Sequence, residues 1–173
     1  MKPLEQSAKV LETSKEYSHP IVALILWLVL ILGLGRGAGI FFGPGPWFES
    51  LVKPSWNPPG WLFGPTWTLL YTLMAISVWK LRRVAYQSGL KSSSAMRLFW
   101  LQLVLNLAWT PIFFGLQQPG LAFLEICILW CVALSTALAF GKISGIAGYL
   151  LLPYLLWLSF ALVLNGTIWL LNS

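Results

Sequence analysis

Charged residues are scarce in this chain. Asp, Glu, Lys and Arg make up 9% of its 173 residues, whereas 58% of the residues are hydrophobic. A soluble domain carries roughly 25% charged residues, so this composition excludes an ordinary water-soluble domain. The formal charge of +6 does not indicate a nucleic-acid-binding protein, because the Lys and Arg residues are spread among apolar runs. We expect a single domain whose partner is the lipid bilayer and not a nucleic acid.

Histidine and cysteine are also nearly absent. The single histidine, His19, precedes the first apolar run, so no Ser–His–Asp or Cys–His catalytic arrangement can be built inside the apolar part. For the same reason, a tetrapyrrole bound there would be metal-free or held without a histidine ligand to iron. Cys127 and Cys131 have no second pair or histidine nearby, which makes a poor metal site. We expect no metal site and no obligatory cofactor.

The chain is rich in long apolar runs. A spanning helix needs about 20 mostly apolar residues, and five windows qualify, at about 20–41, 62–79, 98–115, 121–140 and 149–171. Residues 1–19 are polar and lack the pattern of a secretory signal. The prediction is an all-α integral membrane protein, with a polar tail over residues 1–19 and a five-helix transmembrane domain over residues 20–173.

Lys and Arg fall unequally on the two sides of this predicted bundle. The N-terminal side carries Lys2, Lys9, Lys15, Lys80, Arg82, Arg83, Lys91, Arg97 and Lys142, and the opposite side carries Arg36 and Lys53. By the positive-inside rule, the N-terminus is cytoplasmic if the membrane is a bacterial plasma membrane. For a eukaryotic chain we expect an organelle membrane instead, where the rule is less secure.

The long first loop contains the stretch "KPSWNPPGWLFGPTW", residues 53–67. Its prolines cannot continue a helix and restrict their neighbours, so we expect a stiff lid. Gly64 and Pro65 suit the start of the second helix. Trp56 and Trp61 fit an interfacial aromatic belt as well as a binding role. Trp67 fits a belt less well, because it already lies inside the apolar run.

Three predicted helices each carry a face that is both aromatic and polar. These faces hold Trp67 and Tyr71, then Asn106, Trp109 and Phe113, and then Tyr154, Trp157, Ala161 and Asn165. If they converge, they form an aromatic cavity with a few polar groups, suited to a flat and largely apolar ligand. Asn106 also fits a purely structural role in joining helices, and Pro111 is expected to kink its helix.

Two further features leave alternatives open. Glu125 is the only acid within a predicted span, so it is a functional candidate. A carboxyl group hydrogen-bonded to a tryptophan, or simply protonated, explains it equally well. Small residues spaced four apart, namely Gly33 and Gly37, Gly35 and Gly39, and Ala133, Ala137 and Gly141, fit close packing within the bundle or a homodimer contact.

The strings "WFESLVKPSWNPPGWLFGPTWTLLY", "LNLAWTPIFFG" and "LLPYLLWLSFALVLNGTIWLLN", in this order, resemble the translocator protein family, also known as TspO or the peripheral benzodiazepine receptor family. The resemblance covers about residues 30–172. It implies a five-helix bundle that is often a dimer and that binds porphyrins such as protoporphyrin IX, benzodiazepine-site ligands and sterols.

The resemblance also implies roles for individual residues. Trp67 and Trp157 resemble a tryptophan pair linked to light-dependent porphyrin degradation. Asn106 resembles the pocket asparagine, Phe113 and Phe114 match the family's "FFG" aromatics, and Ala161 matches a small residue beside the ligand. Glu125 occupies the position of a family acid. Trp47 and Phe48 match the start of the loop motif.

The chain departs from the family pattern at two places. Phe48 stands where the family usually has a tyrosine, so a pocket hydroxyl is missing. A proposed sterol motif needs a tyrosine and a basic residue near the end of the fifth helix, where this chain has Gly166 and Leu170. We therefore do not predict cholesterol binding, and that motif is a weak pattern in any case.

The leading hypothesis is a membrane receptor or sensor for tetrapyrroles, in which the ring stacks on Trp67 and Trp157 and meets polar groups of Asn106 and Tyr71. Light-dependent degradation of the porphyrin would make it an enzyme. One alternative is a transporter of porphyrins or lipids, although the chain lacks an evident inverted repeat and has few buried charges to couple an ion. Another alternative is a dimeric membrane scaffold.

Overall fold

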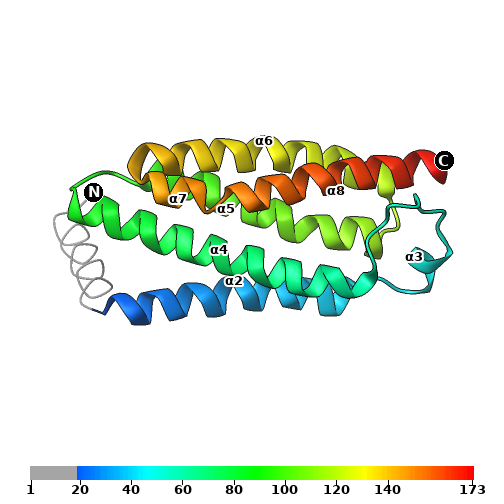
Figure 1. The fold of residues 1–173 in the computed structure, drawn as a ribbon, viewed down its shortest axis with the longest axis horizontal. Coiled ribbons are helices and arrows are strands. Elements are labelled where there is room, and N and C mark those ends of the chain that lie inside the picture. Colours follow the sequence, from blue (N-terminus) through cyan, green and yellow to red (C-terminus); the bar gives the residue numbers. More distant parts are fainter. Residues whose placement is uncertain (1–18) are drawn as a thin grey trace, which may run out of the picture.

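A computed structural model describes residues 19–173, which form an all-α bundle (Figure 1). The elements are α2 (Pro20–Phe42), α3 (Pro46–Ser50), α4 (Gly60–Gln87), α5 (Ser93–Thr110), the π-helical turn η1 (Pro111–Gly115), α6 (Pro119–Ile143), α7 (Gly145–Tyr149) and α8 (Leu152–Leu171). Five helical segments among these residues are long and apolar enough to cross a membrane. The expected five-helix bundle is confirmed, and the chain is a multi-pass integral membrane protein. The expected polar tail lies outside the described residues except for His19.

The helix α4 is longer than its sequence window at both ends. It begins at Gly60, so Pro65 lies inside the helix and not at its start as expected. The hydroxyls of Thr66 and Thr68 donate to the carbonyls of Leu62 and Gly64 around this proline. At its other end α4 continues past the basic residues to Gln87, where Gly89 adopts a positive φ of 64° and closes the turn.

Helices α2 and α4 pack against each other on one side of the bundle, and α6 packs against α8 on the other (Figure 1). Helix α5 lies against α6 and α2 and joins the two sides. The tightest approach of α2 to α4 is at Gly35, where any added Cβ would overlap the ring of Tyr71. Ala133 and Ala137 are buried in the same core, so these small residues pack within the bundle, while Gly33 and Gly37 have open space beside them.

Pro111, at which the sequence predicted a kink, begins the wider turn η1. The N–H of Leu116 donates to the carbonyl of Pro111 at 2.8 Å, which is the i→i+5 bond of a π-helix. This turn directs Phe113 into the bundle, where it is 1% exposed, and keeps Phe114 half-buried beside it.

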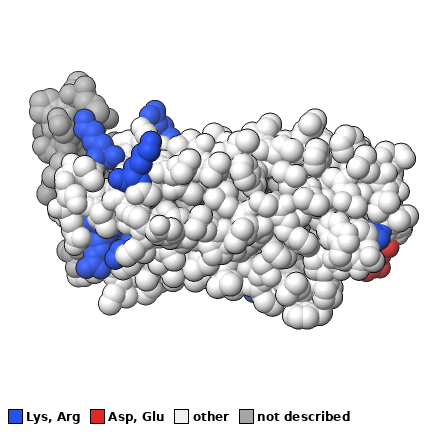
Figure 2. All heavy atoms as spheres, turned by 45° about the horizontal axis from the view of Figure 1, so that its top comes forward, with Lys and Arg blue, Asp and Glu red and all other residues white. Residues whose placement is uncertain are grey.

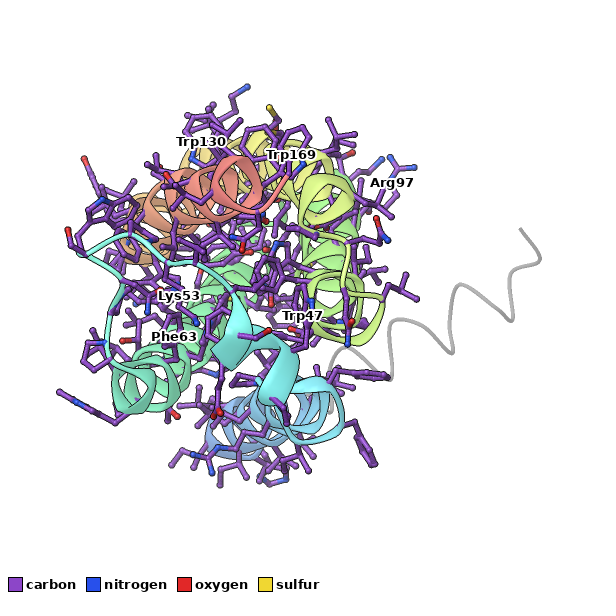
Figure 3. All side chains as sticks on the ribbon, turned by 90° about the vertical axis from the view of Figure 1, so that its right-hand side faces the viewer. Trp47, Lys53, Phe63, Arg97, Trp130 and Trp169 are labelled. Carbon is purple, nitrogen blue, oxygen red and sulfur yellow. The ribbon has the colours of Figure 1, made fainter. Side chains whose placement is uncertain are left out.

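The two ends of the bundle differ in charge. Lys and Arg gather over the end at which α2 begins and α4 ends (Figure 2). The opposite end is crossed by residues 43–59, which include α3 and which we call the lid (Figure 3). The cations at the lid end, among the described residues, are Arg36 and Lys53. This asymmetry agrees with the one counted from the sequence.

Candidate ligand-binding site

A cavity of about 460 Å³ lies beneath the lid, between the lid-side halves of the helices. Its walls come from α2, the lid, α4, α5, η1, α6 and α8. The residues that line it are Gly35, Arg36, Gly39, Ile40, Gly43, Pro44, Phe48, Asn57, Pro58, Gly60, Phe63, Gly64, Trp67, Thr68, Tyr71, Asn106, Trp109, Thr110, Phe113, Phe114, Ile126, Leu129, Trp157, Leu158, Ala161, Leu164, Asn165 and Ile168. The three aromatic and polar faces recognised in the sequence therefore do meet at one cavity, although Tyr154 itself does not line it.

The inner end of the cavity is fixed by a hydrogen-bonded chain across three helices. The hydroxyl of Tyr71 on α4 donates to Oδ1 of Asn106 at 2.8 Å. The Nδ2 of Asn106 on α5 donates to the hydroxyl of Tyr154 on α8 at 3.2 Å. Asn106 thus joins helices and lines the cavity at once, so its two proposed roles are compatible. Tyr154 lies behind the cavity wall and supports Asn106.

A second polar contact holds α5 to α8 and to the start of α6. The indole N–H of Trp109 donates to Oδ1 of Asn165 at 3.1 Å, and Nδ2 of Asn165 donates to the carbonyl of Pro119 at 2.8 Å. The ring of Trp109 stacks on that of Phe113, with centroids 4.8 Å apart. Because the indole N–H of Trp109 is already bonded to Asn165, this wall of the cavity presents mainly aromatic surface to a ligand.

Trp67 and Trp157 line the cavity from α4 and α8. Trp67 stacks on Tyr71 at a centroid distance of 5.2 Å, and Trp157 meets Phe63 edge-on at 5.9 Å, which connects the two helices. Within the described part of the chain, neither indole N–H has a hydrogen-bond partner. Both tryptophans therefore retain an unused donor beside a partly exposed ring.

The lid closes the cavity with aromatic contacts and is tied to the end of α8. Phe48 packs on Phe113 and Phe114 with centroids 6.1 and 5.3 Å apart, and Trp47 packs on Phe113 at 5.7 Å. The side chain of Asn172 accepts from the N–H of Val52 and donates to its carbonyl, both at 2.9 Å. Trp47 covers the cavity wall from outside without lining it.

Glu125 is buried, at 8% exposure, and does not line the cavity. Neither of its carboxyl oxygens has a hydrogen-bond partner among the described residues, so the expected bond to a tryptophan is not formed. The nearest tryptophan along α6, Trp130, donates instead to the hydroxyl of Ser159 at 2.9 Å. No three His, Cys, Asp or Glu side chains between residues 19 and 173 lie close enough to hold a metal ion.

Many lining residues were not named as candidates from the sequence, and Arg36, Asn57, Phe63 and Thr68 are among them. Asn57 is the most informative, because its Oδ1 is buried without a hydrogen-bond partner among the described residues, while its Nδ2 donates to the carbonyl of Pro58. In the sequence, its position between Trp56 and two prolines could have identified Asn57 as a candidate site residue. Because the neighbouring prolines stiffen the lid, the side chain of Asn57 has few possible orientations at the cavity wall.

Comparisons with known proteins agree with this architecture. The TspO/MBR family matches residues 20–170. The tryptophan-rich protein TspO of Chlorobaculum tepidum is 43% identical over 155 residues, which cover 88% of this chain and 97% of that protein. The tryptophan-rich sensory protein of Cereibacter sphaeroides is 36% identical over 143 residues, 83% of this chain and 87% of that one. The translocator protein of Homo sapiens is 37% identical over 139 residues, 80% of this chain and 82% of that one. The chain therefore belongs to the TspO/MBR family.

Proposed function

We propose that this chain is a membrane receptor or sensor that binds a tetrapyrrole such as protoporphyrin IX in the cavity beneath the lid. The observation that carries the proposal is the meeting of Trp67, Trp109 and Trp157 around one cavity. Its volume of about 460 Å³ lies within the range of roughly 300–1,000 Å³ that is usual for small-molecule sites. Aromatic walls favour a flat ring, which they contact face-on or edge-on.

The few unsatisfied polar groups of the cavity complement such a ring. The indole N–H groups of Trp67 and Trp157 are donors for peripheral acceptors of the ligand, and Oδ1 of Asn57 is an acceptor for an N–H or O–H. Asn106 and Tyr71 keep their mutual bond and position the inner wall. An unpaired buried acceptor is costly, so a ligand that donates to Asn57 removes that cost.

Titration with protoporphyrin IX in nanodiscs tests the proposal through quenching of tryptophan fluorescence. We expect saturable quenching for the unmodified chain. Ala161→Phe puts a ring into the cavity and should weaken binding about fivefold to 150-fold, since overfilling costs roughly 1–3 kcal/mol. Leu156→Phe is the matched control on the same helix, because Leu156 is 72% exposed on the bundle surface. Absence of saturable quenching would leave the scaffold alternative.

A light-driven reaction is a second candidate, supported by the unpaired indoles of Trp67 and Trp157 at the same cavity. Light excites the porphyrin, one indole donates an electron to the excited ring and later recovers it, and dioxygen is the oxidant. One dioxygen adds across a carbon–carbon bond at a methine bridge, which breaks to leave two carbonyl groups on the opened ring. Replacing both tryptophans by phenylalanine should slow the loss of porphyrin absorbance under illumination, with binding measured separately. Equal bleaching rates at equal occupancy would exclude this reaction.

A further inference from the structure

Some residues of the cavity wall are also exposed on the outside of the bundle, and they mark where the cavity opens. The exposed lining residues are Arg36, Gly39, Ile40, Pro44, Gly60 and Gly64. All of them belong to the second half of α2, the start of the lid or the start of α4. Every lining residue from α5, η1, α6 and α8 is buried or half-buried. The opening therefore lies on the side of the bundle, between α2 and α4.

The packing of α2 against α4 explains why an opening exists there. The helices touch at Gly35, where the ring of Tyr71 occupies the space of a side chain. Closer to the lid, an added Cβ would meet nothing within 4 Å on Gly39, about one turn beyond Gly35, or on Gly64, about two turns before Tyr71. Gly39 and Gly64 both line the cavity and are exposed, so the opening lies between the contact of Gly35 with Tyr71 and the lid, on the outer side of the bundle.

Arg36 stands at this opening, both exposed and lining the cavity. It is six residues from the end of α2 at Phe42, or roughly 9 Å at the rise of an α-helix. The described residues contain two acids, Glu49 and Glu125, and Arg36 pairs with neither of them. Lys53 differs, because its ammonium group donates to the carbonyls of Glu49 and Leu51.

A guanidinium group without a counterion is unfavourable at the edge of the hydrocarbon region. It is a strong bidentate donor for a carboxylate or phosphate. From this geometry we infer that the opening between α2 and α4 is the route into the cavity, and that Arg36 binds the anionic oxygens of an amphiphile whose apolar part lies inside. This inference rests on the proposed function, because it names the chemistry of the ligand's outer edge. The oxyanion belongs either to the ligand, as a carboxylate, or to a lipid headgroup.

The anion site is tested with protoporphyrin IX and its dimethyl ester in neutral phosphatidylcholine nanodiscs. If Arg36 binds a ligand carboxylate, Arg36→Gln should weaken binding of the diacid about tenfold, as expected for a charge-assisted hydrogen bond, and change that of the diester less than twofold. Arg36→Lys should retain part of the diacid preference. If neither porphyrin binds the unmodified chain, the proposed function fails, and not the assignment of Arg36 alone.

The same measurement in nanodiscs that contain phosphatidylglycerol distinguishes the second source. If a lipid phosphate occupies Arg36, the anionic lipid should change diester affinity for the unmodified chain and have no effect on Arg36→Gln. If Arg36→Gln alters neither the diacid preference nor the lipid response while both porphyrins bind, the anion site is disproved.

The route is tested by kinetics, with a matched pair of glycine variants on α2. Gly39→Leu places a side chain in the open space of the gap and should slow porphyrin association several-fold with little change in stability. Gly37→Leu is the control, because Gly37 also has open space beside it but does not line the cavity. Equal association rates for both variants and the unmodified chain would show that the ligand enters elsewhere.

Discussion

At the scale of single residues, Asn106 determines how the inner end of the cavity is held. Replacing it by leucine leaves the hydroxyls of Tyr71 and Tyr154 without their partner. Each lost partner costs roughly 1–3 kcal/mol when the group stays unsatisfied, although in membranes the mean cost of a lost side-chain bond is about 0.6 kcal/mol. We expect Asn106→Leu to lower the unfolding free energy by about 1–3 kcal/mol, measured by titration with a denaturing detergent.

A set of tyrosine variants makes this test specific. Tyr71→Phe removes one donor but leaves the bond between Asn106 and Tyr154, so its effect should be smaller. In the Asn106→Leu background, changing both tyrosines to phenylalanine removes the stranded hydroxyls and should restore most of the lost stability. Failure of this restoration would show that Asn106 acts through packing and not through its hydrogen bonds.

Site residues could be predicted from the sequence where helical spacing is enough to show that their side chains lie on the same face of a helix. Trp67 with Tyr71 and Asn106 with Trp109 share faces by i, i+3 or i+4 spacing, and all four line the cavity. Helical spacing did not predict the surroundings of Glu125, because the position of one acid along a helix does not show which side chains of other helices it contacts. Arg36 was counted on the side opposite the N-terminus, but spacing on one helix could not reveal that it lines a cavity between α2 and α4.

At the scale of elements, Asn172 ties the lid to the end of α8. Its side chain makes both hydrogen bonds to the backbone of Val52. Asn172→Ala should loosen the lid and speed porphyrin dissociation by up to about thirtyfold, because two bonds of about 1 kcal/mol each are lost. Ser173→Ala is the control, since its hydroxyl contacts only the carbonyl of Trp169 at the same terminus. Equal dissociation rates would mean that aromatic packing of Phe48 alone keeps the lid closed.

The elements themselves were largely predictable, and their ends were not. Long apolar runs identify spanning helices because length and composition are sufficient. The window 62–79 missed Gly60 and Trp61 at the start of α4, and Pro65, which suited a helix start, lies inside the helix. The window also missed the last eight residues of α4, Lys80–Gln87, because basic side chains can follow a helix out of the apolar region.

At the scale of the whole molecule, the charge difference between the two ends predicts the orientation. Among the described residues, the lid end carries Arg36 and Lys53 and the opposite end carries Lys80, Arg82, Arg83, Lys91, Arg97 and Lys142, so the lid should face away from the cytoplasm in a bacterial inner membrane. Alkaline phosphatase fused after Ser173 should then be active, and green fluorescent protein fused at the same point should be dark. A fluorescent, phosphatase-inactive pair would reverse the assignment and place the lid in the cytoplasm.

The bond between Asn172 and Val52 has a practical consequence for anyone handling this protein. The lid is fastened over the cavity by Asn172, one residue before Ser173, so a purification tag appended after Ser173 would strain this fastening. Porphyrin affinities measured on such a preparation would then depend on the tag as well as on the cavity. Placing the tag at the distant basic end leaves this fastening undisturbed.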